Sequence, residues 1–335
     1  MINVNYSDIF VKDTDKSNFP QFSNFSNKSI LITGSQGMLG GGLSATIVEY
    51  VRNNSQCAIT IFLASRKWEA LKPLRFFNSS VIYISNSEAR ARLYEFNFII
   101  HCASPSNFSK VTSYEDLLDI NQKFLEDCIG NQTECVTYIS SGEVYGGEST
   151  TTLPSRKNLM AKEDRGFYPL AKLATEEFLA ELNQNQGLKV KTLRLFHTFG
   201  PGLSRDDGRS FSDFLYAGAD NNPICLKTSG KQVRSFLYLA DAVRAIFHFT
   251  LASRNYELHN IGSDIPVSIE EFAEMVAKVT RQKVVFLPED GYVMSPFSLI
   301  LPDIDTARAE GWRPHTNLVD SINQTIQWIR KSNFA

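Results

Sequence analysis

Tyr168 and Lys172 are the residues whose types and spacing most directly suggest catalysis. They begin and end the segment Tyr-Pro-Leu-Ala-Lys, and this spacing places both side chains on one face of a helix. An ammonium group beside a phenol favours the phenolate, so Tyr168 could exchange a proton near neutral pH. Such pairs also occur as solvated pairs, but Ser141 lies upstream at the end of an apolar strand pattern. Its hydroxyl could bond the same substrate oxygen.

A glycine-rich turn predicts a dinucleotide site. The apolar run 30–33 leads into Gly34, Gly37 and Gly40, and a helix pattern follows. Gly34 allows a sharp turn, Gly37 lets backbone amides approach a pyrophosphate, and Gly40 lets the helix pack close to the sheet. The alternative is a glycine-rich turn without a ligand. The predicted cofactor-binding residues of this turn are Gly34, Ser35, Gln36, Gly37, Met38 and Gly40.

The elements that must position these residues alternate as strand and helix along the chain. The strand patterns are short and apolar on both faces, as buried parallel strands are. They lie at 29–33, 58–64, 81–84, 97–102, 135–140 and 190–196. Helix patterns between them lie at 38–52, 117–129 and 169–184. This alternation predicts an α/β fold with a Rossmann-type doubly wound parallel sheet.

The pattern changes after about residue 197, where glycine and proline become frequent. Helix patterns then lie at 240–251, 268–279 and 317–331. We expect an NAD(P)-binding domain at 28–196 and a smaller C-terminal substrate-binding lobe at 197–335, with part of 236–262 returning to the first domain. Residues 1–27 form an N-terminal extension whose phenylalanines pack on the domain, or else a mobile tail.

Composition excludes several classes of protein. A net charge of -2 gives no reason to expect nucleic acid or an acidic membrane as partner. No apolar run approaches the length of a membrane span, and residues 1–13 lack the apolar core of a secretory signal. The five cysteines are scattered and show no zinc spacing, so no metal site is predicted and reduced thiols are expected. These features favour a cytoplasmic protein.

Several motifs beyond the glycine turn carry a resemblance to a known family. They are Ile-His-Cys-Ala-Ser at 100–104, Asn121 in the next helix, Ser-Gly-Glu-Val-Tyr-Gly at 141–146, Arg-Leu-Phe-His-Thr-Phe-Gly-Pro at 194–201, Asp-Gly-Arg at 207–209 and Arg-Ser-Phe-Leu-Tyr-Leu-Ala-Asp at 234–241. With them the chain resembles the extended short-chain dehydrogenase/reductases, the NAD-dependent epimerases and dehydratases of nucleotide sugars. The resemblance implies hydride transfer at a sugar carbon, usually C4, by Tyr168 and Lys172 with help from Ser141.

The resemblance also implies roles for neighbouring residues. Ala103, Asn121, Tyr168 and Lys172 are expected beside the cofactor, and Ser104 beside the substrate. Asn121 has a second interpretation from the residues alone. It lies on the apolar stripe of its helix, so it faces inward and must find hydrogen-bond partners, as a structural asparagine does.

Glu143 is the residue that could narrow the reaction. By resemblance it stands where 4,6-dehydratases and glucuronate decarboxylases of nucleotide sugars have a functional glutamate, while simple 4-epimerases usually differ. Many such dehydratases have an aspartate just before it, but this chain has Gly142. Decarboxylases tend to have a basic pair before the segment that here reads Pro-Asp-Ile at 302–304, and residues 298–301 contain no cation. The alternative for Glu143 is a carboxylate that caps a loop.

Three further residues, in addition to Ser104, are expected to contact the substrate. Arg209 and Arg234 resemble the family's pyrophosphate-binding arginines, and a guanidinium fork suits two phosphate oxygens. Surface arginines are the alternative. His197 replaces the asparagine usual in its motif, and near a strand end it could equally be a hydrogen-bonded structural histidine.

The end of the second strand concerns the choice of cofactor. NAD-specific proteins commonly have an acidic residue there, and none occurs between Cys57 and Lys67. Ser65 and Arg66 suit the 2′-phosphate of NADP, whereas stacking of Arg66 on adenine would also permit NAD.

The residues together predict a nucleotide-sugar enzyme working as an epimerase, 4,6-dehydratase or decarboxylase. The alternatives are an NADPH-dependent 4-ketosugar reductase and, more distantly, a dinucleotide-sensing protein without turnover. The resemblance also implies a homodimer built on the helices near 117–129 and 169–184.

Overall fold

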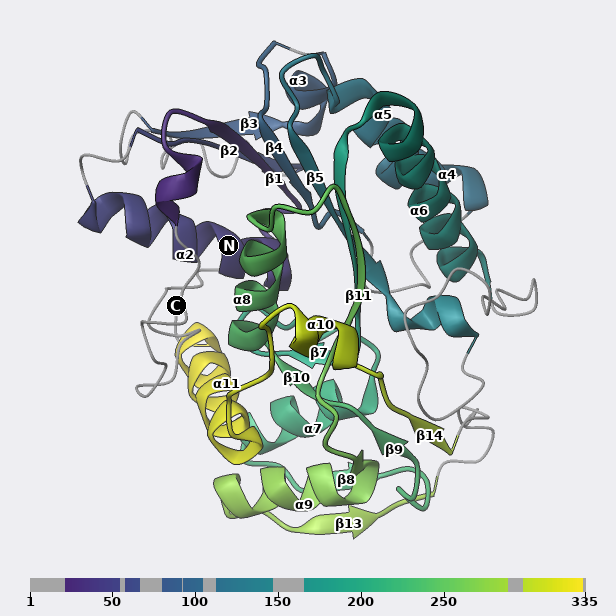
Figure 1. Ribbon diagram of the computed structural model, residues 1–335. Coiled ribbons are helices and arrows are strands. Elements are labelled where there is room, and N and C mark those ends of the chain that lie inside the picture. Colours follow the sequence, from purple (N-terminus) through teal and green to yellow (C-terminus); the bar gives the residue numbers. More distant parts are fainter. Residues whose placement is uncertain are drawn as a thin grey trace.

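The protein is described from a computed structural model (Figure 1). The structure describes residues 22–54, 58–66, 80–91, 93–104, 113–146, 166–288 and 298–333. Lys67 and Cys57, two of the residues considered above, lie outside these ranges, as do residues 1–21.

A seven-stranded sheet of parallel strands forms the centre of the molecule, in the order β11-β6-β5-β4-β1-β2-β3. Its strands are β1 (Ser29–Thr33), β2 (Thr60–Ser65), β3 (Val81–Ser85), β4 (Phe98–His101), β5 (Cys135–Ser141), β6 (Lys189–Leu195) and β11 (Tyr256–Ile261). The order reverses between β1 and β4, and ligands of doubly wound sheets bind at the carboxyl ends of the strands at such a point. The predicted fold is confirmed.

Helices cover both faces of this sheet (Figure 1). One face carries α2 (Met38–Asn53) and α8 (Leu239–Thr250), which contact each other, and the other carries α4 (Tyr114–Leu118), α5 (Phe124–Cys128) and α6 (Phe167–Gln186). Side chains of β1 alternate between the two layers. Ile30 and Ile32 pack in one core with Val243 of α8, whereas Leu31 packs in the other with Leu179 of α6.

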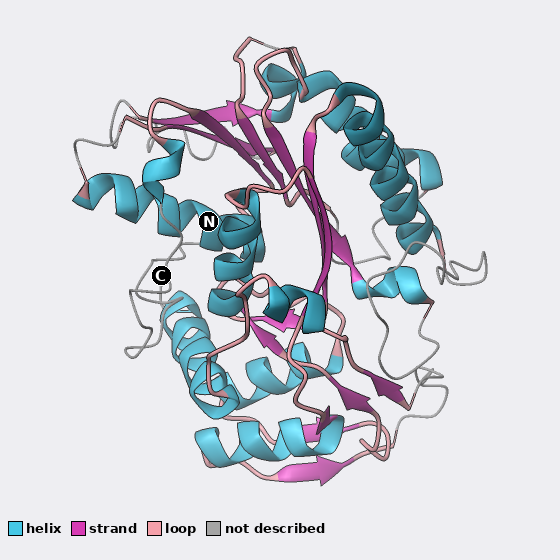
Figure 2. Cartoon of the chain, viewed as in Figure 1, coloured by secondary structure: helices cyan, strands magenta, loops and turns pink. Residues whose placement is uncertain are grey.

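A smaller lobe lies at one end of the large sheet (Figure 2). Its helices α7 (Ser210–Ala219), α9 (Ile269–Thr280) and α11 (Leu318–Asn333) contact one another. Short strands complete the lobe: β8 (Ile224–Leu226) with β13 (Val284–Phe286), and β12 (Val267–Ser268) with β9 (Val233–Arg234) and β14 (Leu299–Ile300). Phe236 and Phe272 stack with ring centroids 4.3 Å apart inside it. Two further pieces connect the lobe to the sheet: the pair β7 (Thr198–Phe199) and β10 (Leu237–Tyr238), and α10 (Asp305–Ala309).

The start of the described chain packs on the sheet domain. Phe22 and Phe25 belong to the short helix η2 (Phe22–Phe25) and are both buried. The Phe22 ring meets Phe247 at 4.7 Å and the Phe25 ring meets Phe98 at 4.8 Å. These two phenylalanines pack on the domain, and residues 1–21 of the predicted extension lie outside the described residues.

The described residues contain neither a membrane-spanning helix nor a cluster of metal ligands. None of their helices is long and apolar enough to cross a membrane. No group of three or more His, Cys, Asp or Glu side chains among them could hold a metal ion.

Candidate active site

The glycine turn joins β1 to α2 in the conformation that the sequence predicts. Gly34 has φ 63°, and a Cβ there would come within 3.0 Å of the Ala103 backbone. A Cβ at Gly40 would collide with the Gly34 backbone, so the helix packs against the turn only because this residue is glycine. Gly37 is different: it is exposed, and a Cβ there would meet only the Gly34 carbonyl at 3.3 Å. Its open side is where a ligand can approach.

The N-terminus of α2 is suited to an anion. Gly37 is its N-cap and supplies no side-chain hydrogen bond, so no side chain of the cap competes for the first amides of the helix. Those amides and the helix dipole favour a phosphate. The residues between the glycines flank this position: the Ser35 hydroxyl donates to the Ala64 carbonyl (3.1 Å), while Gln36 and Met38 are half-buried.

The neighbouring strand ends complete the cofactor side. Ser65 is buried as the last residue of β2, and Arg66 is exposed just beyond it. The Thr33 hydroxyl accepts hydrogen bonds from the amides of Cys102 and Ala103, each at 3.1 Å. These contacts hold the loop after β4 against the glycine turn.

Tyr168 lies in the first turn of α6 and faces Ser141, the last residue of β5. Burial raises the pKa of Tyr168 to about 12, while hydrogen bonds from Ser141 and Ser104 act in the opposite direction. The charge of Glu143 also raises this pKa, and that of Arg209 lowers it. The phenol therefore needs a nearby cation, or a substrate that takes part in the proton transfer, to ionise near neutral pH.

Lys172 is the nearest cation. Its Nζ lies 5.6 Å from the centre of the Tyr168 ring and donates to the Ile139 carbonyl (2.8 Å) and to Asn121 Oδ1 (3.3 Å). Burial lowers the pKa of Lys172 to about 7. An amine with this pKa can gain or lose a proton under ordinary conditions, which suits a proton relay.

Asn121 lies in η5 (Asp119–Lys123), a π-helical turn between α4 and α5. Its Nδ2 donates to the Leu117 carbonyl (2.7 Å), and its Oδ1 accepts from Lys172 and from the Tyr138 hydroxyl (3.2 Å). These contacts support the structural interpretation of Asn121, because its side chain is engaged with protein groups. They also fix Lys172, whose Nζ lies 4.7 Å from the centre of the Tyr138 ring.

The substrate side is assembled from four separate segments. Glu143 is exposed in η6 (Gly142–Tyr145), which follows β5 directly. Arg234 lies in β9 and is buried; burial lowers its pKa, and the charge of Glu143 opposes that change. Arg209 lies just before α7, and its fork binds the carboxylate of Asp207, with NH2 2.7 Å from Oδ2.

His197 lies among these residues. It joins β6 to β7 with φ 28°, a left-handed conformation. Burial, together with the charges of Arg209 and Arg234, lowers the pKa of His197 to about 3. Its buried Nδ1 has no hydrogen-bond partner among the described residues. The imidazole is therefore neutral, and one of its nitrogens is free to bind.

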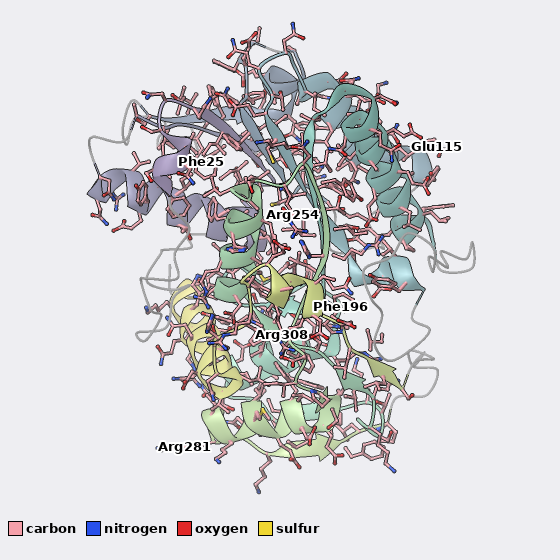
Figure 3. All side chains as sticks on the ribbon, in the orientation of Figure 1. Phe25, Glu115, Phe196, Arg254, Arg281 and Arg308 are labelled. Carbon is pink, nitrogen blue, oxygen red and sulfur yellow. The ribbon has the colours of Figure 1, made fainter. Side chains whose placement is uncertain are left out.

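The space beside Glu143 is filled by an aromatic ring. A Cβ at Gly142 would lie 2.6 Å from the Phe196 ring, which is buried. Figure 3 labels Phe196 between the sheet and the lobe. No side chain fits at position 142 unless Phe196 moves.

Comparison with known proteins identifies the family. Residues 30–262 match the NAD dependent epimerase/dehydratase family. The chain belongs to that family. This confirms the prediction of an NAD(P)-dependent enzyme of the epimerase/dehydratase type that acts on nucleotide sugars, and of the two cofactors left open it is NAD that the family uses.

Individual members of the epimerase/dehydratase family are similar along most of the chain. A dTDP-4-dehydro-6-deoxyglucose reductase of Escherichia coli is 29% identical over 90% of this chain and 97% of its own length. UDP-glucuronic acid decarboxylase 1 of Danio rerio is 25% identical over 91% of this chain and 73% of its own length. The fold matches that of the UDP-glucuronic acid 4-epimerase of Bacillus cereus, solved with UDP-glucuronic acid and NAD, with a TM-score of 0.75, 21% identity, and coverage of 91% and 99% of the two chains.

Two site residues of this epimerase/dehydratase were missed in the sequence. Thr33 is a hydroxyl at the carboxyl end of an apolar strand, and that position alone marks it as facing the ligand edge. Tyr138 is a single aromatic inside β5, and no sequence signal places it under Lys172.

Proposed function

We propose that this chain oxidises a ring hydroxyl of a nucleotide sugar and later returns the hydride to the product. The observation that carries the proposal is the preformed group of Tyr168, Ser141 and Lys172 at the carboxyl edge of the sheet. NAD, when bound, supplies the hydride acceptor. The glycine turn and the uncapped start of α2 fit its pyrophosphate.

The side chains have distinct tasks in this proposal. Tyr168 takes the proton of the sugar hydroxyl, and Ser141 donates a hydrogen bond to the same oxygen. A protonated Lys172 stabilises the phenolate, which otherwise has a pKa of about 12. General-base catalysis of this kind contributes about 10²–10⁴-fold in rate.

We propose NAD rather than NADP as the cofactor. The family is NAD dependent, and the similar 4-epimerase was solved with NAD. Arg66 is exposed, so it can stack on an adenine without forming a closed pocket for a 2′-phosphate. Ala103 lies against the backbone of Gly34 in the glycine turn.

The substrate side supports a negatively charged ligand. Arg209 and Arg234 bring positive charge to His197 from two directions, and Ser104 lies beside Tyr168. We assign these four residues to the nucleotide sugar, with the diphosphate toward the arginines.

The Phe196 ring beside Gly142 bears on the reaction. A 4,6-dehydration needs an acid for the leaving hydroxyl, and no side chain stands at position 142 to supply it. We therefore place epimerisation and decarboxylation ahead of dehydration. UDP-glucuronic acid is the first substrate to test, because similar proteins are named for its decarboxylation and its 4-epimerisation.

A second candidate is an NADPH-dependent 4-ketosugar reductase. The 29% identity to the E. coli dTDP-4-dehydro-6-deoxyglucose reductase over 90% of this chain favours it. Net consumption of reduced cofactor distinguishes it from the first proposal, in which the cofactor is regenerated.

The test is a screen of UDP-, CDP-, GDP- and dTDP-sugars and their 4-keto derivatives with the purified chain, once with NAD and once with NADPH, read by product mass and by proton NMR. We expect a product of unchanged mass with an inverted centre, or a product that has lost carbon dioxide, with no net NADH. A product with two added hydrogens and stoichiometric loss of NADPH would favour the reductase. Tight NAD binding without turnover of any sugar would contradict both and favour the dinucleotide-sensing alternative.

We further propose that the two parts of the chain bind different ligands. Residues 28–196 hold the cofactor and contribute Ser104 and Ser141 to the sugar, while 197–335 mainly hold the substrate. Within the second part, β11 pairs with β6 in the large sheet and α8 covers that sheet, which supports a partial return of 236–262 to the first domain.

A cytoplasmic homodimer through α4, α5 and α6 is also proposed. Phe167, at the start of α6, is half-exposed, and its ring lies 6.4 Å from that of Tyr114 on α4. Exposed aromatic pairs are typical of interface cores. Light scattering of the chain and of Phe167→Ser tests this; a monomeric parent protein would contradict it.

A further inference from the structure

A buried network of polar side chains lies directly behind the proposed active site. Glu176 binds Arg194 twice, from Arg194 Nε to Oε1 (3.0 Å) and from NH2 to Oε2 (2.5 Å). The Ser140 hydroxyl donates to Glu176 Oε1 (2.5 Å). Arg194 NH1 donates to the Tyr145 hydroxyl (2.9 Å), and that hydroxyl donates to Asn260 Oδ1 (2.7 Å). All five residues are at most 4% exposed.

Four members of this network lie close in sequence to residues of the site, and the fifth, Asn260, contacts the chain near the lobe. Glu176 follows Tyr168 and Lys172 at the same four-residue spacing on α6, so the three share one helix face. Ser140 precedes Ser141 on β5, and Tyr145 is the last residue of η6, the turn that carries Glu143. Arg194 stands three residues before His197. Asn260, through Nδ2, donates to the Asp303 carbonyl (3.1 Å), close to β14 of the lobe.

The charges in this network are poorly explained by stability alone. Burial opposes the positive charge on Arg194, and the Glu176 carboxylate overcomes that effect and raises the pKa of the guanidinium. Buried ion pairs can often be replaced by apolar side chains of similar volume without loss of stability. Such pairs are instead able to fix one geometry among several, because each hydrogen bond has a required direction.

We propose that Glu176 and Arg194 are positioning residues that hold α6, β5 and η6 in the register at which Tyr168, Ser141 and Glu143 meet one substrate. They touch neither substrate nor cofactor. This inference rests on the proposed function for its kinetic consequence. The guanidinium is the centre of the arrangement, because it bonds both Glu176 of α6 and Tyr145 of η6.

The decisive variant removes both charges together. A single Arg194→Met change would leave Glu176 buried without its partner and is expected to disturb folding. The double variant Glu176→Leu/Arg194→Met avoids this, and we expect its unfolding midpoint to stay near that of the parent protein. Its kcat should fall about 10–100-fold, because small displacements of catalytic groups have effects of this size. Its KM should change less than about threefold, because the residues that hold the substrate remain.

The matched control is a second buried ion pair, Lys191–Glu257, whose side chains are 0% and 2% exposed and 2.5 Å apart. It lies on the neighbouring strands β6 and β11, and within the described part of the chain Lys191 Nζ donates to the Arg254 carbonyl and to Glu257, not to α6 or η6. Lys191→Met/Glu257→Leu should keep the kcat of the parent protein. Equal loss of kcat in both double variants would show a general effect of core substitution and would overturn the proposal.

A measurement without substrate separates this inference from the proposed function. Lys172 Nζ lies 4.7 Å from the Tyr138 ring on β5, so ring currents shift the NMR signal of its ε-methylene. Carbon-13 lysine labelling, with the signal assigned by Lys172→Met, reports the position of α6 on β5. We expect this signal to move or broaden in the Glu176/Arg194 double variant and to stay unchanged in the control. If no nucleotide sugar is turned over, the proposed function fails while this test of the register still stands.

Two conservative variants keep the inference falsifiable if the double variant does not fold. Tyr145→Phe removes one hydroxyl, and we expect kcat to fall about 3–10-fold, the effect of a lost hydrogen bond. Arg194→Lys keeps the charge but cannot bind Glu176 twice and Tyr145 as well, so kcat should stay below that of the parent protein. Parent kcat and an unchanged Lys172 signal in both variants would overturn the proposal.

Discussion

The glycine turn and the cluster around Arg234 lie at the same edge of the large sheet, but they are built in different ways. The turn is one contiguous segment, and its work is done by backbone atoms: Gly34 approaches Ala103 closely, and Gly40 packs on the Gly34 backbone. The cluster draws Glu143, His197 and the two arginines from four segments of the chain. Contacts made by backbone depend little on sequence, whereas a cluster of side chains can be altered one residue at a time. This contrast agrees with a match to one NAD dependent family over residues 30–262, while the similar proteins are named for different nucleotide sugars.

The relay of Tyr168 and Lys172 stands between the two regions. Its lysine is buried, and Glu143 and Arg209 of the substrate side change the pKa of its phenol. The relay therefore belongs to both regions, and substitutions in it should have the largest effects.

Tyr168→Phe tests the relay itself. The variant keeps the ring and removes the hydroxyl, so turnover should fall about 10²–10⁴-fold while NAD affinity stays within a few-fold of the parent value. Steady-state rates and NAD titration by fluorescence measure the two effects. Turnover close to that of the parent protein would exclude Tyr168 from the mechanism.

Gly37→Val tests the cofactor side. The open side of Gly37 accepts a side chain without collision inside the protein, so the fold should persist. The valine would displace a pyrophosphate from the helix amides, and two lost charge-assisted hydrogen bonds cost about 3–4 kcal/mol, roughly 10²–10³-fold in NAD affinity. Gly130→Val is the control, because a Cβ at Gly130 has nothing within 4 Å. Unchanged NAD affinity in Gly37→Val would place the pyrophosphate elsewhere.

Glu143→Gln tests the substrate side. If Glu143 removes a proton or positions the sugar after oxidation, turnover should fall on the order of 10²-fold and bound cofactor should accumulate in its reduced form. Stopped-flow absorbance of NADH measures both. Turnover within a few-fold of the parent value would favour simple 4-epimerisation or ketosugar reduction. Loss of substrate binding alone would make Glu143 a structural residue.

The sequence was sufficient to predict the local structure of the glycine turn and the helix that carries Tyr168 and Lys172. The glycine spacing after an apolar strand is a local pattern, and so is the Tyr–Lys pair at helix spacing. Such patterns depend only on residues close in sequence, so distant contacts do not alter them. Both appear in the structure at the predicted residues. The parallel, doubly wound character of the sheet followed from the alternation of strand and helix, whereas the order of its strands came from the structure.

Features that depend on distant partners were not predictable. Strand β11 was absent from the predicted strands because Glu257 and His259 interrupt its apolar pattern. The buried Glu257 carboxylate is stabilised by His259 and by Lys191 of the neighbouring strand β6. The π turn at Asn121 has no sequence pattern, since it depends on the contacts of that side chain with Tyr138 and Lys172. The pairing of Arg209 with Asp207 likewise required the structure.

Arg66→Ala tests which part of the cofactor Arg66 contacts. Loss of a charge-assisted contact with a 2′-phosphate costs about 1.5–3 kcal/mol, so NADP affinity should fall about 10–100-fold. NAD affinity should fall only a few-fold, because stacking on adenine contributes less. Arg52→Ala on the exposed face of α2 is the control, and its affinities should equal those of the parent protein. Equal and large losses for both cofactors would show that Arg66 acts on a part that they share.

Substitution of the two buried histidines is expected to have the smallest effect. It compares the two regions directly through the pH dependence of the free energy of unfolding. Burial lowers the pKa of His101 on the cofactor side and of His197 on the substrate side from 6.5 to about 3. The unfolded chain therefore binds protons that the folded chain does not, so the free energy of unfolding falls as the pH drops from about 6.5 to about 3.

His197→Asn should remove one of these contributions at little cost. Nδ1 of His197 has no partner among the described residues, and asparagine accepts the left-handed backbone, so stability at pH 7 should change by less than about 0.5 kcal/mol. The loss between pH 7 and pH 5 should shrink by on the order of 1 kcal/mol, measured by urea unfolding at both values. His101→Asn should instead be destabilised at both, because His101 Nδ1 bonds the Thr33 hydroxyl at 3.0 Å. An unchanged pH difference in His197→Asn would mean that folding does not lower the pKa of His197, so that the imidazole is protonated in the folded chain at pH 5. The substrate side would then hold a third positive charge beside Arg209 and Arg234, and it would favour a more anionic ligand than the neutral imidazole implies.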